Sequence, residues 1–201
     1  MSQPVAFFDV DGTLFRSSLL IELVEEFVRR GVFPSDATSG YTKEHLEWLD
    51  RVGSYEEYIR AVVDTFRAHL KGVHYGELAD VGKEVAREHG RRVYRYTRDT
   101  IKKLKSEGYF LVAISQSPKT ILDDFCLGYG FDKIYGRMYE TGPQDRFTGA
   151  VMDEHLIENK GTIVRRVAEK HDVDMSRSLG VGDTEGDISL LELMTDRKSV
   201  V

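Results

Sequence analysis

The sequence lacks the features that mark secreted, membrane-spanning and disulfide-rich proteins. Cys126 is the single cysteine among 201 residues, which excludes an internal disulfide and a cysteine-rich zinc site. The longest apolar runs, such as residues 5–8 and 110–114, are far shorter than the roughly 20 residues needed to cross a bilayer. The N-terminus has neither the basic nor the apolar region of a secretory signal. We therefore expect a cytoplasmic protein with no membrane partner.

Positive charge is not in excess either. The chain has 28 Lys and Arg against 34 Asp and Glu, a formal net charge of -6. The basic run at residues 91–105 is typical of a solvated helix face, so we predict no nucleic-acid partner. With 41% hydrophobic residues and no repeats, the length suits one large domain or a domain with an insertion.

The order of apolar patterns predicts an α/β fold. Residues 5–8, 110–114 and, more weakly, 178–182 have the character of buried strands, and residues 131–151 suggest a hairpin. Helical spacing separates these strands and follows the last one, from 188 to 194, which favours a doubly wound, mostly parallel Rossmann-like sheet. Residues 16–92 show helical spacing with no strand-like run. We expect a core domain of residues 1–15 and 93–201 and a helical domain of residues 16–92 inserted in it.

Polar residues stand where the predicted strands end. Asp9 and Asp11 follow the first strand, Ser115 follows the second, and Asp183 follows the strand at 178–182. In open α/β sheets, ligands bind outside the carboxyl ends of the strands. Carboxylates from Asp9 and Asp183 with the Asp11 backbone carbonyl would make an all-oxygen site suited to Mg²⁺. Lys160 would supply the charge that holds a carboxylate and a phosphate in one pocket.

Four motifs in order along the chain carry a family resemblance. They are Asp9-Val10-Asp11-Gly12-Thr13, Ser115 after an apolar strand, Lys160, and Gly182-Asp183 with Asp187. The chain resembles the haloacid dehalogenase-like (HAD) superfamily of aspartate-nucleophile phosphohydrolases. The helical insertion directly after the first motif resembles the cap of the phosphoserine-phosphatase-like branch, type IB, so residues 16–92 are expected to form a cap domain.

The resemblance implies a role for each motif residue. Asp9 would attack phosphorus and form an aspartyl-phosphate, while Asp11 would protonate the leaving group and later activate water. The second aspartate, Asp11, also favours phosphoryl transfer over dehalogenation, because a halide needs no proton. Mg²⁺ held by Asp9, the Asp11 carbonyl and Asp183 would reduce the repulsion between nucleophile and phosphoryl group.

The remaining site residues are expected to bind substrate or to support the others. Ser115, Gln116 and Lys160 are the predicted phosphoryl and substrate contacts, and Asp187 is expected to orient its neighbours. Taken alone, a strand-end serine, a lysine and acids at a helix start are also ordinary structural features. Their order along the chain is what favours the catalytic interpretation.

Substrate specificity is where the sequence departs from the branch. Phosphoserine phosphatases carry a glutamate nine residues after the nucleophile, where this chain has Ser18; Glu22 lies one helical turn further on. Both residues are candidates for substrate contacts. Gly186 stands where an asparagine commonly helps to hydrate the metal. The branch has another strand and usually a helix after the last motif, so we expect either a final strand that is only a stub or a truncated chain.

The sequence therefore predicts a magnesium-dependent phosphatase acting on a small phosphorylated metabolite. Two alternatives stay open at this point. One is a phosphotransferase or mutase in which an alcohol intercepts the same aspartyl-phosphate, and the other is a catalytically disabled phosphate- or metal-binding module. The physiological substrate and the oligomeric state are equally open.

Overall fold

A single six-stranded sheet forms the centre of the molecule. The computed structural model describes residues 2–157 and 159–199. Its strand order is β4-β3-β2-β1-β5-β6. In chain order the strands are β1 (Gln3–Phe8), β2 (Phe110–Pro118), β3 (Lys133–Thr141), β4 (Phe147–Met152), β5 (Val173–Gly182) and β6 (Asp196–Ser199). All neighbours pair in parallel except β3 and β4, which form the predicted antiparallel hairpin. The predicted α/β class with a mostly parallel sheet is confirmed.

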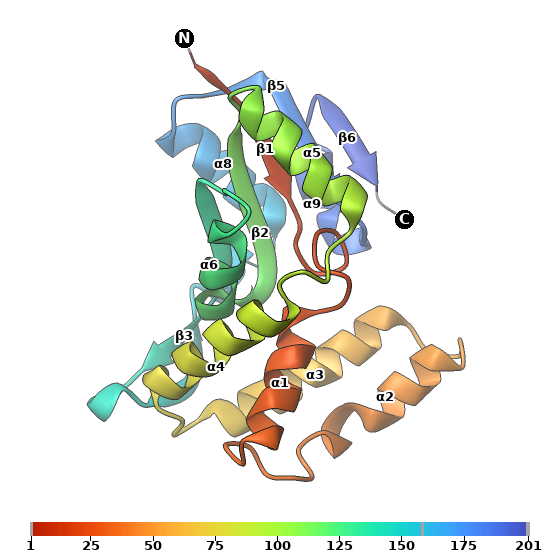
Figure 1. Cartoon of the computed structure of the whole chain (residues 1–201), viewed down its shortest axis with the longest axis vertical. Helices are drawn as coiled ribbons and strands as arrows, with labels where there is room; N and C mark the ends of the chain where they lie inside the picture. The colour runs from red at the N-terminus through yellow and green to blue at the C-terminus, as the bar shows by residue number, and fades with distance from the viewer. Residues whose placement is uncertain (1, 158, 200–201) are drawn as a thin grey trace.

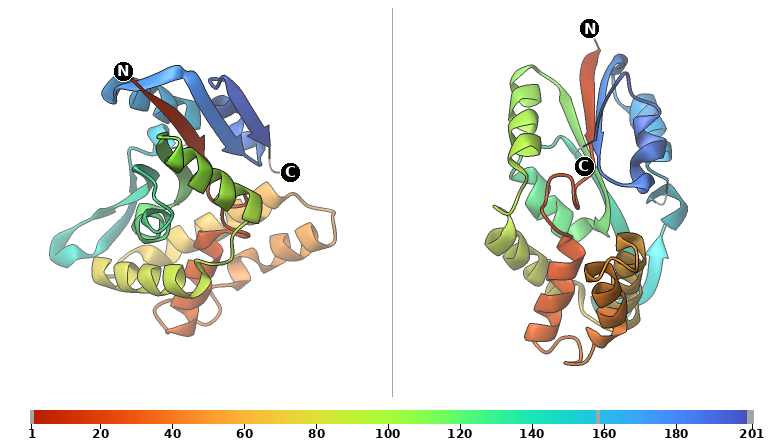
Figure 2. Two further views of the ribbon diagram at one scale, coloured as in Figure 1. Left: turned by 45° about the horizontal axis from the view of Figure 1, so that its top comes forward. Right: turned by 90° about the vertical axis from the view of Figure 1, so that its right-hand side faces the viewer.

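Helices lie on both faces of the sheet and beyond one end of it (Figure 1). The four between β1 and β2 that lie beyond the sheet are α1 (Leu19–Arg29), α2 (Ser39–Leu49), α3 (Tyr55–Leu70) and α4 (Tyr75–His89). Those along the sheet are α5 (Arg95–Ser106), α6 (Lys119–Leu127), α7 (Glu154–Ile157), α8 (Lys160–Lys170) and α9 (Ile188–Leu191). Figure 2 shows α5 and α6 on one face, with α8 and α9 on the other. None of the described helices is long and apolar enough to traverse a bilayer.

The central strand β1 explains the two layers. Successive side chains on a strand point to opposite faces, so a strand buried on both sides is apolar throughout. Ala6 and Phe8 join the larger apolar cluster, which also contains the inner faces of α1, α3, α4 and α6. Val5 and Phe7 join the smaller cluster under α7, α8 and α9. The strand therefore contacts both helical layers, and it ends at Phe8, directly before Asp9.

Two elements differ in length from their sequence patterns. Strand β5 begins at Val173 rather than near residue 178. The sequence pattern did not show this start because the first half of the strand is only partly buried and carries no continuous apolar run. Helix α9 ends at Leu191 rather than near residue 194. The first half of β5 is paired but incompletely buried, whereas Met194 is buried although α9 has already ended. Apolar periodicity therefore reports burial and not hydrogen bonding.

The chain leaves the sheet and returns to it at one place. Phe15 and Val93 form an isolated antiparallel bridge. The Arg16 backbone N–H donates to the Arg92 carbonyl at 2.9 Å, and Tyr94 N–H donates to the Leu14 carbonyl at 2.9 Å. These two adjacent crossings coincide with the predicted boundaries at 15/16 and 92/93. The division into a core domain and a cap domain remains a prediction, and we keep the terms core and cap for these residue ranges.

Candidate active site

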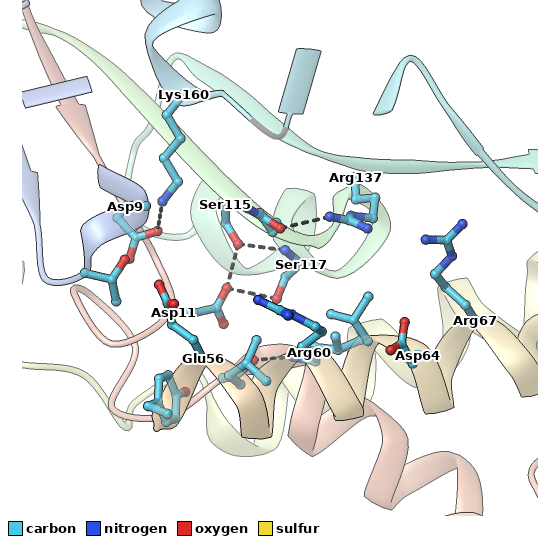
Figure 3. Close-up of a pocket in the computed structure, with 18 of the residues that line it drawn as sticks. Asp9, Asp11, Glu56, Arg60, Asp64, Arg67, Ser115, Ser117, Arg137 and Lys160 are labelled. Atoms are coloured by element: carbon cyan, nitrogen blue, oxygen red, sulfur yellow. Dashed lines mark hydrogen bonds and ion pairs between the residues drawn. The ribbon is translucent and has the colours of Figure 1, made fainter. Parts of the chain in front are cut away.

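The predicted motif residues meet at the carboxyl ends of the central strands (Figure 3). Asp9 and Asp11 follow β1, Ser115 lies near the end of β2, and Lys160 begins α8. These four side chains line a cavity of about 410 Å³ between the core and helix α3. Asp183, which follows β5, lies next to Asp9.

Lys160 is held between two buried carboxylates. Its Nζ lies 2.5 Å from Asp9 Oδ1 and 2.5 Å from Asp187 Oδ1. Burial, the largest cause, raises the pKa of Asp9 to about 8, although the Lys160 ammonium acts to lower it. Burial acts to lower the pKa of Lys160, but the two carboxylates outweigh it and the pKa is raised. Lys160 is therefore a positively charged side chain that is held in place by two carboxylates and contacts Asp9 directly.

Asp9 also carries an oxygen that no other group satisfies. Its Oδ2 is buried and has no hydrogen-bond partner among the described residues. Carboxylate oxygens of Asp9, Asp183 and Asp187 all lie within 4.8 Å of one another. Hard divalent cations such as Mg²⁺ bind oxygen ligands of this kind, and an unpaired buried oxygen is costly without one. The donor set fits a divalent cation.

The hydrogen bonds of Asp187 give it a different task. Its Oδ2 accepts from the backbone N–H groups of Asp183 and Thr184, both at 3.0 Å, and from Thr184 Oγ1 at 3.1 Å. Its Oδ1 accepts from Lys160. With both oxygens occupied, Asp187 orients its neighbours and leaves Asp9 and Asp183 as the freer ligands.

Gly12 permits the close approach of Asp183. It has φ +87°, and a Cβ atom at this position would lie 2.2 Å from Asp183 Oδ2. Thr13 Oγ1 donates to Asp183 Oδ1 at 2.7 Å. Burial, the largest cause, raises the pKa of Asp183, while the Thr13 hydrogen bond acts to lower it. The Gly12-Thr13 turn thus fixes one candidate metal ligand against the first motif.

Asp11 is held by three donors. Its Oδ2 accepts from Ser115 Oγ at 2.5 Å and from Ser117 Oγ at 2.8 Å. Its Oδ1 accepts from the Leu19 backbone N–H at 2.6 Å. The Ser117 N–H also donates to Ser115 Oγ at 2.9 Å. Sequence reasoning missed Ser117; the only available signal was a second serine two residues after the first.

The cap contributes one face of α3 to the cavity, which sequence reasoning also missed. The lining residues recur at helical spacing: Tyr55, Glu56, Ile59, Arg60, Val63, Asp64 and Arg67. In Figure 3 the Arg60 side chain extends toward Asp11 and Ser117, while Arg67 extends toward Arg137. Burial, followed by the nearby carboxylates of the core, raises the pKa of Tyr55. These residues mix polar and apolar side chains, so their spacing in the sequence does not indicate a cavity-lining face until the position of the cavity is known.

The two specificity candidates occupy different surroundings. Ser18 lines the cavity, but its hydroxyl also caps α1 by accepting from the Leu20 backbone N–H at 3.2 Å. Glu22 is not among the lining residues; it pairs with Arg92 at 2.8 Å and with His89 at 3.6 Å. Substrate contacts by either residue remain a prediction.

The far wall of the cavity is built around Arg137 of β3. Its Nη2 donates to Gln116 Oε1 at 2.8 Å, so the predicted substrate residue Gln116 has a protein partner. Its Nη1 donates to Glu154 Oε1 at 3.2 Å. Arg67 Nη1 of the cap donates to the same Glu154 oxygen at 3.1 Å. Arg137, Glu154 and Arg67 thus connect core and cap across the cavity.

Comparisons with known proteins agree with this geometry. The family of haloacid dehalogenase-like hydrolases matches residues 6–192. The phosphoserine phosphatase of Methanocaldococcus jannaschii is 25% identical over 186 residues, which are 92% of this chain and 79% of that protein. A solved phospho-aspartyl intermediate analogue of phosphoserine phosphatase has a TM-score of 0.63 at 22% identity, covering 98% of this chain and 86% of that one. A Bordetella pertussis Tohama I protein of unknown function has a TM-score of 0.75 at 17% identity, covering 98% and 89%.

Proposed function

Because this chain belongs to the haloacid dehalogenase-like hydrolase family, we propose that it is a magnesium-dependent phosphatase for a small phosphomonoester. One observation carries the proposal. Asp9 has a buried oxygen with no partner in the described part of the chain, beside the Lys160 ammonium and at a cavity that Asp11 also lines. This arrangement supports Asp9 as the nucleophile, Lys160 as its cation and Asp11 as the acid-base group. The similarity to phosphoserine phosphatases supports the same reaction class.

The first half of the reaction transfers the phosphoryl group to Asp9. An Asp9 oxygen attacks phosphorus in line, and the bond from phosphorus to the leaving oxygen breaks as the new bond forms. Asp11 donates its proton to the leaving alkoxide, which departs as an alcohol. Lys160 stays on Asp9 and balances the charge of the transferring group, and Ser115 donates a hydrogen bond to a phosphoryl oxygen.

The second half hydrolyses the aspartyl-phosphate. Asp11, now ionised, takes a proton from water as that water attacks phosphorus, and the carboxylate of Asp9 is released with inorganic phosphate. Asp9, Asp183 and the Asp11 backbone carbonyl would hold Mg²⁺, which supplies charge neutralisation to the phosphoryl oxygens. Asp187 and Thr13 keep these groups in place through the contacts described above.

The cavity limits the substrate to a compact molecule. Its volume of about 410 Å³ is at the small end for ligand pockets, and α3 covers it. A cover of this kind excludes water from the phosphoryl group and selects the leaving group. We also propose a cytoplasmic location, which the single cysteine of the chain supports.

The test is phosphate release from a panel of small phosphomonoesters with and without Mg²⁺. We expect magnesium-dependent release that Asp9→Asn abolishes. Asp124→Asn is the matched control, because Asp124 is exposed and has no recorded side-chain hydrogen bond among the described residues. Release that survives in Asp9→Asn would refute the mechanism. Added alcohols that become phosphorylated would identify a phosphotransferase, and magnesium binding without turnover on any substrate would identify a disabled module.

A further inference from the structure

Arg137 is a buried cation with too few partners. Its side chain is only 6% exposed, yet its Nε is buried and unpaired among the described residues. A guanidinium has five N–H donors, and the structure records two hydrogen bonds from this one, to Gln116 and Glu154. Buried charges are normally fully paired and hydrogen-bonded, because leaving them short of partners costs free energy.

Within residues 2–157 and 159–199, the one acid that contacts Arg137 is shared. Glu154 Oε1 accepts from both Arg137 and Arg67, so two guanidinium ions divide a single carboxylate. Gln116 offers Arg137 only a neutral amide oxygen. Lys160, at the other end of the cavity, contrasts with this arrangement, because it contacts two carboxylates of its own.

The other charged residues of this cavity have their own partners or are exposed to solvent. Asp9 contacts Lys160, and Asp11 accepts from Ser115 and Ser117, at the phosphoryl end of the cavity. Glu56, Arg60 and Asp64 line it from α3, and all three are exposed residues. Water and salt screen exposed charges much more than buried ones. Glu56 and Asp64 therefore compensate Arg137 weakly, and an anion that enters the cavity would meet Arg137 with Arg67 beside it.

We propose that Arg137 and Arg67 form a second anion site, which binds an anionic group on the leaving portion of the substrate. The inference rests on the proposed phosphatase function and narrows it to phosphomonoesters that carry a carboxylate or a second phosphate. Gln116 follows Ser115 directly and contacts Arg137, so it links this site to the phosphoryl end. A compact substrate can reach both ends because the same cavity contains them.

The test compares phosphonates, which bind without turnover. Calorimetric titration with Mg²⁺ present would use propylphosphonate, 3-phosphonopropionate, which adds a carboxylate, and ethane-1,2-bisphosphonate, which adds a second phosphonate. We expect at least one of the two probes with a second anionic group to bind about 10- to 100-fold more tightly than propylphosphonate, as hydrogen bonds between charged partners allow. If 3-phosphonopropionate gains more affinity than ethane-1,2-bisphosphonate, the second group of the substrate is a carboxylate; the reverse order indicates a phosphate.

Gln116→Glu is the decisive variant because it separates binding from stability. The new carboxylate would pair with Arg137, so we expect the melting temperature to stay the same or rise. The affinity for the probes with a second anionic group should fall to within about threefold of that for propylphosphonate. Arg67→Gln should also reduce the preference. The control is Arg87→Gln, because Arg87 is an exposed cap arginine on α4 whose side chain is 73% exposed.

Two results would overturn the second anion site. One is equal affinity of all three probes for the wild-type protein, and the other is a preference that survives in Gln116→Glu. Release of phosphate from 4-nitrophenyl phosphate, assayed in parallel, reports the proposed function separately. Failure of phosphate release from every member of the phosphomonoester panel would refute the phosphatase and leave the binding comparison to decide the anion site.

Discussion

Replacing Ser117 with alanine tests whether the second hydroxyl on Asp11 serves proton transfer. Ser115 and Ser117 both donate to Asp11 Oδ2, at 2.5 and 2.8 Å. When a phosphoryl oxygen recruits the Ser115 hydroxyl, Ser117 is the side-chain donor that remains on Asp11. We therefore expect Ser117 to act as a positioning residue for the acid-base carboxylate.

The size of the effect follows from the lost hydrogen bond. A hydrogen bond to a charged group contributes about 1.5–3 kcal/mol, which corresponds to roughly a 10- to 100-fold change in rate if it is fully expressed in the transition state. The Leu19 backbone N–H still holds the other oxygen of Asp11. We therefore expect the lower end, about tenfold, for reactions that need Asp11 as an acid.

The assay uses leaving groups of different basicity. Alkyl phosphates release a basic alkoxide that needs the Asp11 proton, whereas 4-nitrophenyl phosphate releases a stable phenolate. Because kcat/KM reports events up to formation of the aspartyl-phosphate, Ser117→Ala should lower kcat/KM for alkyl phosphates about tenfold and for 4-nitrophenyl phosphate less than about threefold. Ser117→Thr keeps a hydroxyl and should restore most of the loss.

Two controls separate positioning from general damage. Ser115→Ala should lower kcat/KM for both substrate types, because it also loses the phosphoryl contact. The melting temperature of Ser117→Ala shows whether the buried site has been disturbed, since Ser117 is only 3% exposed. An equal loss on both substrate types, or no loss on either, would refute this role for Ser117.

Three further outcomes follow from the site. Burial raises the pKa of Asp9 to about 8, and the metal needs the ionised carboxylate, so the apparent Mg²⁺ affinity should rise with pH by up to about tenfold per unit until pH 8. Calorimetry should detect the proton that binding releases. An Mg²⁺ affinity that does not change from pH 6 to 8 would contradict this prediction. Lys160→Met removes the cation from buried Asp9 and Asp187, so urea unfolding at pH 9 should show a loss of about 3–5 kcal/mol in the free energy of unfolding, which shrinks as the pH falls below about 8 and Asp9 is protonated; a loss independent of pH would point to packing alone. Gly12→Ala places a methyl group against Asp183, so Mg²⁺ binding should weaken at least about tenfold and the free energy of unfolding should fall by about 1–3 kcal/mol. Unchanged Mg²⁺ binding would contradict this and show that the turn can adjust.

Apolar periodicity and strand-end chemistry predicted the parts of the molecule that burial determines. Strand β1 is apolar because both of its faces are covered, and Asp9 follows where that pattern stops. The weakly apolar first half of β5 gave no such signal, although it pairs with β1 all the same. Local patterns record burial, so hydrogen bonding without burial escapes them.

The polar wall of the site was beyond sequence reasoning for another reason. Ser117 and Asp11 are 106 positions apart, and Arg67 and Glu154 are 87 apart. Hydroxyl and guanidinium groups are common on surfaces, so neither residue type indicates a partner until the fold brings the two together. The family motifs pointed to Asp9 and Lys160, but the contacts that distinguish this cavity needed the structure.

The paired chain crossings at Phe15 and Val93 have a consequence for how this protein can change over evolution. An insertion whose two ends are already joined by backbone hydrogen bonds, from Arg16 to Arg92 and from Tyr94 to Leu14, holds its attachment points at a fixed spacing whatever lies between them. The closure entropy of a loop grows only slowly with its length, so the sheet tolerates a long or a short insert at nearly equal free energy. We therefore expect the length of the segment between these crossings to vary among related proteins while the strands that hold Asp9 keep their places.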